Sequence, residues 1–366
     1  MFTRLHSSGI IPCMAKKRVT LEEISEKIDI SRTTLYKVIN NKGRVSERTR
    51  RKVLEAVEEY GYKPNRAAQN LALNREFFVE FIGFESPRSP HFLKNIMRGI
   101  DTAEHELHDF GLNIKTHIFP LDDPNSQIKK LKSLSGKNVD AVALIPNDIG
   151  IGRNITAVQQ EVDRLREDGV IVVTVNRDLP DSKRSWYVGC DYEKSGALAA
   201  EMLGKMCSRG DILLPIGGNE NEYYDLYHRL KGFNRKIAQF DHLRILSSYH
   251  YYNHPEDLYS YLDTKLSENP YISGLFDLTY ELDVISAVIS KHSHSAKVIG
   301  FDLCESIKQR MLEHSVDAIV FQDMFSQGYL TIKSIYTALS QGGVPEAGEV
   351  LTKLEVVFEE NLDFYI

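Results

Sequence analysis

The chain has 366 residues, which is long for a single hydrophobic core and indicates two or three domains. Hydrophobic residues make up 42% of it and there are only 12 prolines, so the composition excludes an intrinsically disordered protein. No apolar run approaches the roughly 20 residues that a membrane helix requires. Residues 1–15 also lack the apolar centre of a secretory signal. We therefore expect a soluble, cytoplasmic protein that has no membrane partner.

Motifs for catalysis and cofactor binding are missing. The cysteines at 13, 190, 207 and 304 lie far apart and form no C-x-x-C pair, which argues against both a zinc site and a disulfide framework. The glycine-rich turn at 215–219 has neither the G-x-x-x-x-G-K-[ST] nor the G-x-G-x-x-G pattern, and G-x-S-x-G and H-E-x-x-H do not occur. We expect no enzyme, no cofactor and no metal.

The charge is distributed unevenly along the chain. The net charge is -6, but residues 16–75 contain 15 Lys and Arg against 8 Asp and Glu, a net of +7, so the remainder carries -13. A basic segment joined to an acidic body is typical of a nucleic-acid-binding module attached to a domain that does not bind nucleic acid.

The basic segment contains the signals of three short helices. Thr20 and Glu23 have the spacing of a capping box, which predicts a helix that ends near residue 29. Ser31 can cap a second helix over residues 32–40, with Leu35, Val38 and Ile39 facing inward. Polar and basic side chains then face outward from this second helix, as in a helix-turn-helix.

A third helix is predicted from the cap at Ser46 to Gly61, with Val53, Leu54 and Val57 facing inward. Residues 64–75 would allow one more helix, too short to be stable without a partner. Pattern alone also allows a plain helical bundle with a solvated basic face.

Three runs of residues distinguish these readings. They are 19–40 (VTLEEISEKIDISRTTLYKVIN), 45–50 (VSERTR) and 61–72 (GYKPNRAAQNLA). Together they closely resemble, in order and spacing, the DNA-binding head of the LacI/GalR family of bacterial transcription regulators. The resemblance implies a helix-turn-helix domain at 16–63 and a hinge helix at 64–75. Residues 1–15, which precede or include the alternative start at Met14, are expected to be a dispensable extension.

The same resemblance assigns roles to residues in the head. The positions that match base-reading residues of the major groove are Arg32, Thr33 and Lys37. The positions that match phosphate contacts are Thr20, Ser31, Thr34, Asn40 and Arg50. The hinge positions are Asn65, Arg66, Gln69, Leu71 and Ala72, with Leu71 matching a leucine that wedges into the minor groove. A role as an ordinary core leucine is the alternative for Leu71.

From residue 76 onward, segments typical of strands and helices alternate. Examples are the strand at 78–84, the helix at 92–110 and the strand at 113–119. Nearly 300 residues of this pattern predict two lobes, each with a parallel sheet between helices. Ligands bind outside the carboxyl ends of such strands. Amides, carboxylates and an arginine next to aromatic residues follow several of the predicted strands, as a polyhydroxylated ligand would require.

This body resembles the effector-binding core of the same family, which is similar to periplasmic sugar-binding proteins of type I. The resemblance implies that residues 76–366 bind an effector and form a dimer. The positions it assigns to the effector site are His91, Phe92, Asp148, Arg229, Tyr280, Asp302 and Gln322. Tyr280-Glu281 departs from the Asn-Asp pair common in the family. For Asp148, Arg229 and Asp302, capping and ion pairing at strand ends are the alternative roles.

The sequence therefore predicts a repressor of carbohydrate-utilisation genes. A homodimer would bind a pseudo-palindromic double-stranded operator, and a small sugar or sugar-phosphate effector would control it allosterically. Two alternatives stay open at this stage. One is a constitutive DNA-binding regulator with a degenerate sensor, and the other is a sugar-binding module that binds DNA only incidentally.

Overall fold

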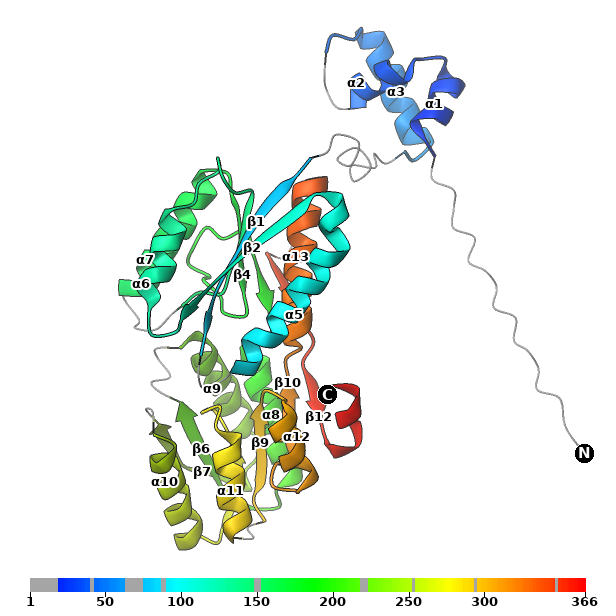
Figure 1. The fold of residues 1–366 in the computed structure, drawn as a ribbon. Helices are drawn as coiled ribbons and strands as arrows, with labels where there is room; N and C mark the ends of the chain where they lie inside the picture. Colours follow the sequence, from blue (N-terminus) through cyan, green and yellow to red (C-terminus); the bar gives the residue numbers. More distant parts are fainter. Residues whose placement is uncertain are drawn as a thin grey trace, which may run out of the picture. The chain divides into compact units, whose positions relative to one another are not determined.

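A computed structural model describes residues 19–39, 43–62, 75–86, 90–147, 153–217, 223–251, 254–292, 295–345 and 348–366 (Figure 1). The chain divides into two compact units, Met1–Gln69 and Asn70–Ile366, and each is described by itself. No described helix is long and apolar enough to span a bilayer.

The first unit contains three helices, α1 (Leu21–Ile28), α2 (Arg32–Ile39) and α3 (Glu47–Glu59). The predicted capping box is present at the start of α1. The Glu23 amide donates to Oγ1 of Thr20 at 3.2 Å, and the Thr20 amide donates to the Glu23 carboxylate at 2.9 Å. Ser46 caps α3 in the predicted place by accepting from the Thr49 amide. The three predicted helices are thus confirmed, with ends that differ by one or two residues.

The three helices enclose a small core. Its fully buried members are Ile24, Leu35, Val38, Val53 and Ala56. The prediction that Leu54 faces inward is wrong, because its side chain is 48% exposed. Adjacent residues on a helix point about 100° apart. Since Val53, Ala56 and Val57 pack against the core, Leu54 points to solvent instead.

The second unit contains two lobes, each built on a six-stranded sheet. The first sheet has the order β11-β5-β4-β3-β1-β2, and all its pairings are parallel. Its strands are β1 (Phe77–Glu85), β2 (Leu112–Pro120), β3 (Ala141–Leu144), β4 (Ile171–Val175), β5 (Trp186–Gly189) and β11 (Glu349–Leu351). One face is covered by α5 (Pro90–Leu107) and α13 (Met324–Gln341), and the other by α6 (Pro124–Lys132) and α7 (Arg153–Glu167). A short 3-10 turn, His108–Phe110, connects α5 to β2.

The second sheet has the order β12-β10-β9-β8-β6-β7 and is parallel except for β12, which runs antiparallel to β10. Its strands are β6 (Gly210–Gly217), β7 (Leu243–Tyr251), β8 (Ile272–Phe276), β9 (Lys297–Phe301), β10 (Ala318–Phe321) and β12 (Glu355–Val357). Helices α8 (Tyr192–Met206) and α9 (Tyr224–Ile237) cover one face. The other face packs against α10 (Pro255–Glu268), α11 (Leu282–His292) and α12 (Glu305–Leu312), followed by the 3-10 turn Glu359–Phe364.

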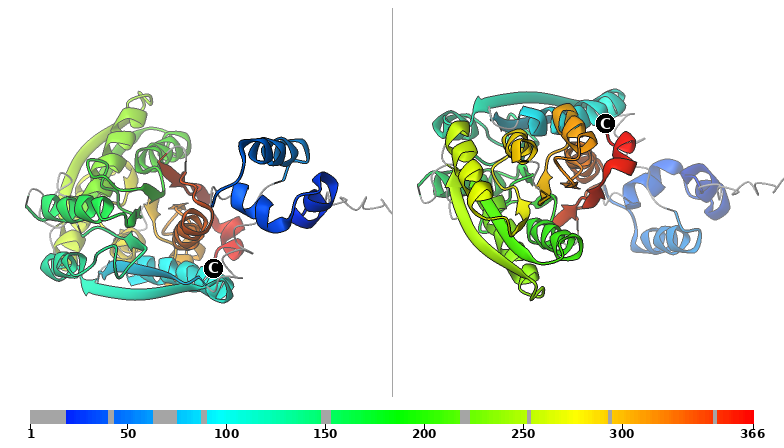
Figure 2. Two further views of the ribbon diagram at one scale, coloured as in Figure 1. Left: turned by 90° about the horizontal axis from the view of Figure 1, so that it is seen from above. Right: turned by 90° about the horizontal axis from the view of Figure 1, so that it is seen from below.

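The predicted pair of lobes with helices on both faces is confirmed (Figures 1 and 2). The chain passes from one lobe to the other after β5, after β10 and after β11. As a result α13, which follows a strand of the second sheet, packs against α5 and buries Ile332 and Ile335 in the core of the first lobe. Neither lobe is therefore a continuous piece of the sequence.

Helices α8 and α9 cross at very short range, and glycines make this possible. A Cβ atom added at Gly196 of α8 would overlap the carbonyl oxygen of Arg229 on α9. A Cβ at Gly232 of α9 would likewise overlap the carbonyl oxygen of Glu193 on α8. The two helices touch backbone to backbone, so α8 sets the position of Arg229.

Replacing Gly196 with alanine should force the two helices apart. Because a packed backbone, not a flexible side chain, occupies the space, we expect Gly196→Ala to lower the free energy of unfolding by roughly 2 kcal/mol or more in urea titrations. Gly343→Ala is the control, since a Cβ at this exposed glycine meets nothing within 4 Å. Equal stability of the two variants would contradict this reading of the crossing.

Candidate functional site

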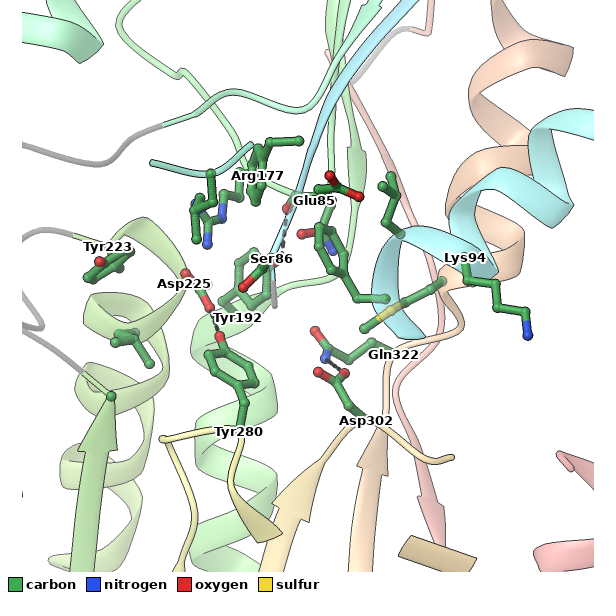
Figure 3. A pocket seen from close by; sticks show the side chains of 18 of the residues that line it. Glu85, Ser86, Lys94, Arg177, Tyr192, Tyr223, Asp225, Tyr280, Asp302 and Gln322 are labelled. Atoms are coloured by element: carbon green, nitrogen blue, oxygen red, sulfur yellow. Dashed lines mark hydrogen bonds between the residues drawn. The ribbon is translucent and has the colours of Figure 1, made fainter. Parts of the chain in front are cut away.

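A cleft of about 870 Å³ lies where strands of both sheets end (Figure 3). Its walls come from β1, α5 and the loop after β4 in one lobe, and from α8, α9 and the loops after β8, β9 and β10 in the other. The polar and aromatic side chains that line it include Glu85, Phe92, Lys94, Asn176, Arg177, Tyr192, Tyr223, Asp225, Arg229, Tyr280, Asp302 and Gln322. Carboxyl ends of parallel strands therefore converge on one cavity, as the sequence predicted.

Left-handed backbone conformations gather at this cleft. Asn176, Tyr280 and Asp302 have φ angles of 61°, 64° and 64° and follow β4, β8 and β9. Such angles are rare for residues other than glycine, and for a bulky tyrosine they are costly. These turns place Asn176, Tyr280 and Asp302 at the cleft, and all three residues belong to its lining.

Arg229 lies at the centre of a buried polar cluster. Its Nη1 donates to Oδ2 of Asp225 at 3.1 Å and to the Tyr280 hydroxyl at 2.9 Å. Its Nη2 donates to Oε1 of Gln322 at 3.0 Å. The guanidinium also lies 4.0 Å from the ring centroid of Phe301. Hydrogen bonds, an opposite charge and an aromatic face together compensate the burial of this cation.

Tyr280 completes the cluster because its hydroxyl also donates to the Asp225 carboxylate (Figure 3). Burial, reinforced by the negative charge of Asp225, raises the pKa of Tyr280 far above its ordinary value. Burial alone would also raise the pKa of Asp225, but the charges of Arg229 and Arg177 and the Tyr280 hydroxyl hold it below its ordinary value. At neutral pH the cluster therefore consists of a carboxylate, a guanidinium and a neutral phenol.

Gln322, which follows β10, links the cluster to Asp302. Its amide nitrogen donates to Oδ1 of Asp302 at 3.2 Å (Figure 3). Its oxygen accepts from Arg229 and from the buried thiol of Cys190. Burial raises the pKa of that thiol to about 12, so Cys190 stays protonated and acts as a donor. The amide orientation is thereby determined by its partners on both sides.

Aromatic rings form the apolar part of the cleft. Phe84 and Phe92 contact each other with ring centroids 5.8 Å apart. The Arg177 guanidinium lies 4.8 Å from the ring centroid of Phe84 and 5.8 Å from that of Tyr223. Ring faces next to carboxylates, amides and guanidinium groups fit a ligand with a flat apolar face and many hydroxyls.

Most of the predicted effector residues meet in this cleft. Phe92, Arg229, Tyr280, Asp302 and Gln322 line it. His91 does not: its side chain is exposed near the start of α5 and is absent from the lining. The reason is helical geometry, since Phe92 occupies the inward position of that turn and the adjacent residue points elsewhere. Asp148 lies outside the described residues.

The sequence reading did not assign Asp225 or Tyr192 to the site. Asp225 lies one helical turn before Arg229 on α9, and this spacing places both side chains on one face. The i, i+4 spacing of an acid and an arginine was thus an available signal. Tyr192 begins α8, and its hydroxyl donates to the carbonyl oxygen of Asn176 at 2.7 Å.

The predicted DNA-contacting residues of the head lie at helix starts and on α2. Arg32, Thr33 and Lys37 have exposed side chains on α2, and Arg32 pairs with Glu22 at 3.1 Å. Thr20 and Ser31 are exposed at the starts of α1 and α2, where the Ser31 and Thr34 hydroxyls bond at 2.9 Å. Arg50 is half-buried on α3. The residues that lie outside the described ranges are Asn40, Asn65, Arg66, Gln69, Leu71 and Ala72.

Among the described residues, no three His, Cys, Asp or Glu side chains come together in a way that could hold a metal ion.

Asp277 is a buried carboxyl with a structural role. Its Oδ1 accepts from the amide and the hydroxyl of Thr279, at 2.7 and 2.6 Å, in the turn that leads to Tyr280. Burial raises the pKa of Asp277 to about 6.

This raised pKa predicts a pH-dependent loss of stability. The folded chain keeps the Asp277 proton up to about pH 6, whereas the ordinary value is 3.8. The contribution of the carboxyl to stability therefore falls as pH rises through this window. We expect Asp277→Asn, measured by urea unfolding against the wild type, to gain up to about 3 kcal/mol of relative stability between about pH 4 and about pH 6. A stability difference that does not change with pH would contradict this assignment.

Comparisons with known proteins agree with the two-part architecture. The family model described as "Bacterial regulatory proteins, lacI family" matches residues 20–65, and the periplasmic binding protein domain model matches residues 82–343. A solute-binding protein of an ABC transporter from Burkholderia graminis, solved with D-arabinose, has the same core fold. The TM-score is 0.68 at 21% identity, and the match covers 80% of this chain and 98% of that one.

Curated relatives are regulators. Catabolite control protein A of Priestia megaterium is 26% identical over 60% of this chain and 61% of its own length, so the match spans less than two thirds of that relative. The sucrose operon repressor of Streptococcus mutans serotype c is 23% identical over 77% of this chain and 82% of its own length. The chain therefore carries a helix-turn-helix region of the lacI family of bacterial regulatory proteins and belongs, over most of its length, to the periplasmic binding protein domain family.

Proposed function

We propose that this protein is a sequence-specific DNA-binding repressor of carbohydrate-utilisation genes whose affinity for its operator is set by a small sugar-like effector. The observation that carries the proposal is that one chain contains both a helix-turn-helix unit and a cleft lined by carboxylates, an amide, arginines and aromatic rings. Either part alone would not indicate a regulator. Together they connect a DNA-binding domain to a ligand-binding domain, as a ligand-controlled regulator requires.

The head has the surface that DNA recognition needs. Arg32, Thr33 and Lys37 project from α2, whose opposite face buries Leu35 and Val38. An arginine can pair with both acceptors of a guanine edge in the major groove. Thr20 and Ser31 lie at helix starts, where phosphates are favourably bound. In this proposal the hinge residues 64–75 contact the minor groove.

The core has the properties of a receptor that couples two sites. Its cleft lies between two lobes that the chain connects three times, so a ligand that contacts both lobes favours one lobe arrangement over the others. Two such chains would form a homodimer that matches the halves of a pseudo-palindrome. By linkage, effector and operator then change each other's affinity by the same factor. The sugar-related names of the sucrose operon repressor and the arabinose complex support a carbohydrate effector.

A combined binding experiment tests this function. An operator is first selected from a random duplex library with the full-length chain, and its affinity is then measured by fluorescence anisotropy with and without a panel of mono- and disaccharides. We expect one selected sequence family with two related halves, and a shift in operator affinity with at least one sugar. Failure to enrich any sequence would refute operator recognition.

The head residues allow a separate test of base reading. Arg32→Ala should weaken binding to the selected operator by about 10- to 100-fold but to random duplex only a few-fold, because a base contact is lost along with a charge. Arg51→Ala is the matched control, since it removes the same charge from an exposed position on α3. If both variants lost affinity by the same factor on the selected operator and on random duplex, the result would count against the base contact.

Asp302 allows a test of the effector site. Asp302→Asn should reduce the apparent effector affinity by about 10- to 100-fold, because it removes a charged acceptor from the cleft, whereas the retained Oδ1 can still accept from Gln322. Effector-free operator binding should stay unchanged, since Asp302 belongs to the core and not to the helix-turn-helix unit. Asp363→Asn, at a side chain that is 94% exposed on the final turn, is the control. A variant that kept the full effector response would remove Asp302 from the site.

A further inference from the structure

On the basis of the proposed sensing function, we propose that the effector is an uncharged polyhydroxylated molecule. The cluster of Asp225, Arg229 and Tyr280 accepts hydroxyl groups and rejects phosphorylated or acidic sugars. The inference deepens the proposed function by naming the charge class of its ligand.

The positive charge of Arg229 is already neutralised by Asp225. The side chains of Arg229 and Asp225 are 3% and 6% exposed, and their ion pair measures 3.1 Å. An arginine that binds phosphate or carboxylate usually does so through two parallel N–H bonds. Here Nη1 donates to Asp225 and Tyr280, and Nη2 donates to Gln322. A contact to an anion through Nη1 and Nη2 would require Arg229 to release the partners of Nη1. Only the edge formed by Nε and Nη2 could bind an anion, and there the anion would meet a guanidinium that Asp225 already neutralises.

Two buried atoms of the ion pair lack hydrogen-bond partners within the part of the chain that the structure describes. Among the described residues, Oδ1 of Asp225 and Nε of Arg229 are buried side-chain atoms without a hydrogen bond. The first needs a donor and the second needs an acceptor. A hydroxyl group is both donor and acceptor, so vicinal hydroxyls can satisfy both atoms. A fully ionised phosphate or carboxylate has no proton to give to Asp225 and would leave Oδ1 unpaired.

The charges in the rest of the cleft also disfavour an anion. Besides the paired Arg229, the described lining contains the cations Lys94 and Arg177 and the carboxylates Glu85, Asp122 and Asp302. Lys94 is exposed, and its side chain points away from the cluster (Figure 3). Arg177 lies over the rings of Phe84 and Tyr223. The described lining thus has four carboxylates, Glu85, Asp122, Asp225 and Asp302, against three cations, Lys94, Arg177 and Arg229. An anionic ligand beside Arg229 would add to this excess of negative charge, and like charges at short range repel one another.

Tyr280 gives this selection its geometry. Its hydroxyl accepts from Arg229 and donates to Asp225, which is the pattern expected of a ligand hydroxyl at the same pair. The left-handed backbone at Tyr280, with φ of 64°, holds the ring over the cluster. The Tyr280 hydroxyl thus bonds to both members of the ion pair. A ligand next to it meets a site whose hydrogen-bonding pattern suits neutral hydroxyl groups.

Matched ligands test the proposal on the wild-type, full-length chain. Each of D-glucose, D-galactose, D-ribose, D-arabinose and D-fructose is compared with its phosphate ester and, for the aldohexoses, its uronic acid, by thermal shift and then by isothermal titration calorimetry. We expect at least one neutral sugar to bind, and its charged counterparts to bind at least 100-fold more weakly.

A variant then tests the cause. Asp225→Asn keeps the shape but removes the negative charge, so the preference for the neutral sugar over its phosphate should fall by at least 10-fold. Asp363→Asn should leave that ratio unchanged. The wild-type ratio decides the matter even if Asp225→Asn does not fold.

The outcomes separate this inference from the function on which it rests. A phosphorylated or acidic sugar that binds as tightly as its neutral counterpart, or more tightly, overturns the charge selection and leaves a sugar-responsive regulator standing. If no carbohydrate of either kind changes the melting temperature or the operator affinity, the sugar-sensing function fails, and the charge inference fails with it.

Discussion

The buried ion pair between Asp225 and Arg229 is the interaction on which the candidate site depends. A guanidinium excluded from water is tolerated only when its charge and its N–H groups have partners. Those partners come from three separate elements: Asp225 from α9 itself, Tyr280 from the turn after β8 and Gln322 from the end of β10. Correct folding of the second lobe is therefore what assembles the cluster.

The close crossing of α8 and α9 also helps to position Arg229 in the cluster. Because Gly196 and Gly232 have no Cβ atoms, the backbones of the two helices touch. The backbone of Arg229 therefore packs directly against α8. Tyr192 at the start of α8 then reaches the carbonyl oxygen of Asn176 in the loop after β4. This hydrogen bond joins the start of α8 to a strand end of the first lobe.

Sequence motifs predicted structure correctly where the interaction joins residues close together in the chain. The capping box at Thr20 and Glu23 and the cap at Ser46 depend on residues three apart, and both are found as predicted. Periodicity was less informative about which face is buried. Leu54 was predicted to face inward with Val53 and Val57, but the packing of α3 buries Val53 and Ala56 and leaves Leu54 in solvent.

By itself the sequence determined the class of each unit, a three-helix head and two lobes with parallel sheets, because helix caps and the alternation of strands and helices are short-range patterns. It also placed Arg229, Tyr280, Asp302 and Gln322 in the cleft, since each lies at a motif or a strand end. Only the tertiary structure decided that Phe92 and not His91 faces the cleft, and that Asp225 neutralises Arg229. Those contacts depend on how helices cross and on left-handed turns, and both arise from packing between residues far apart in the chain.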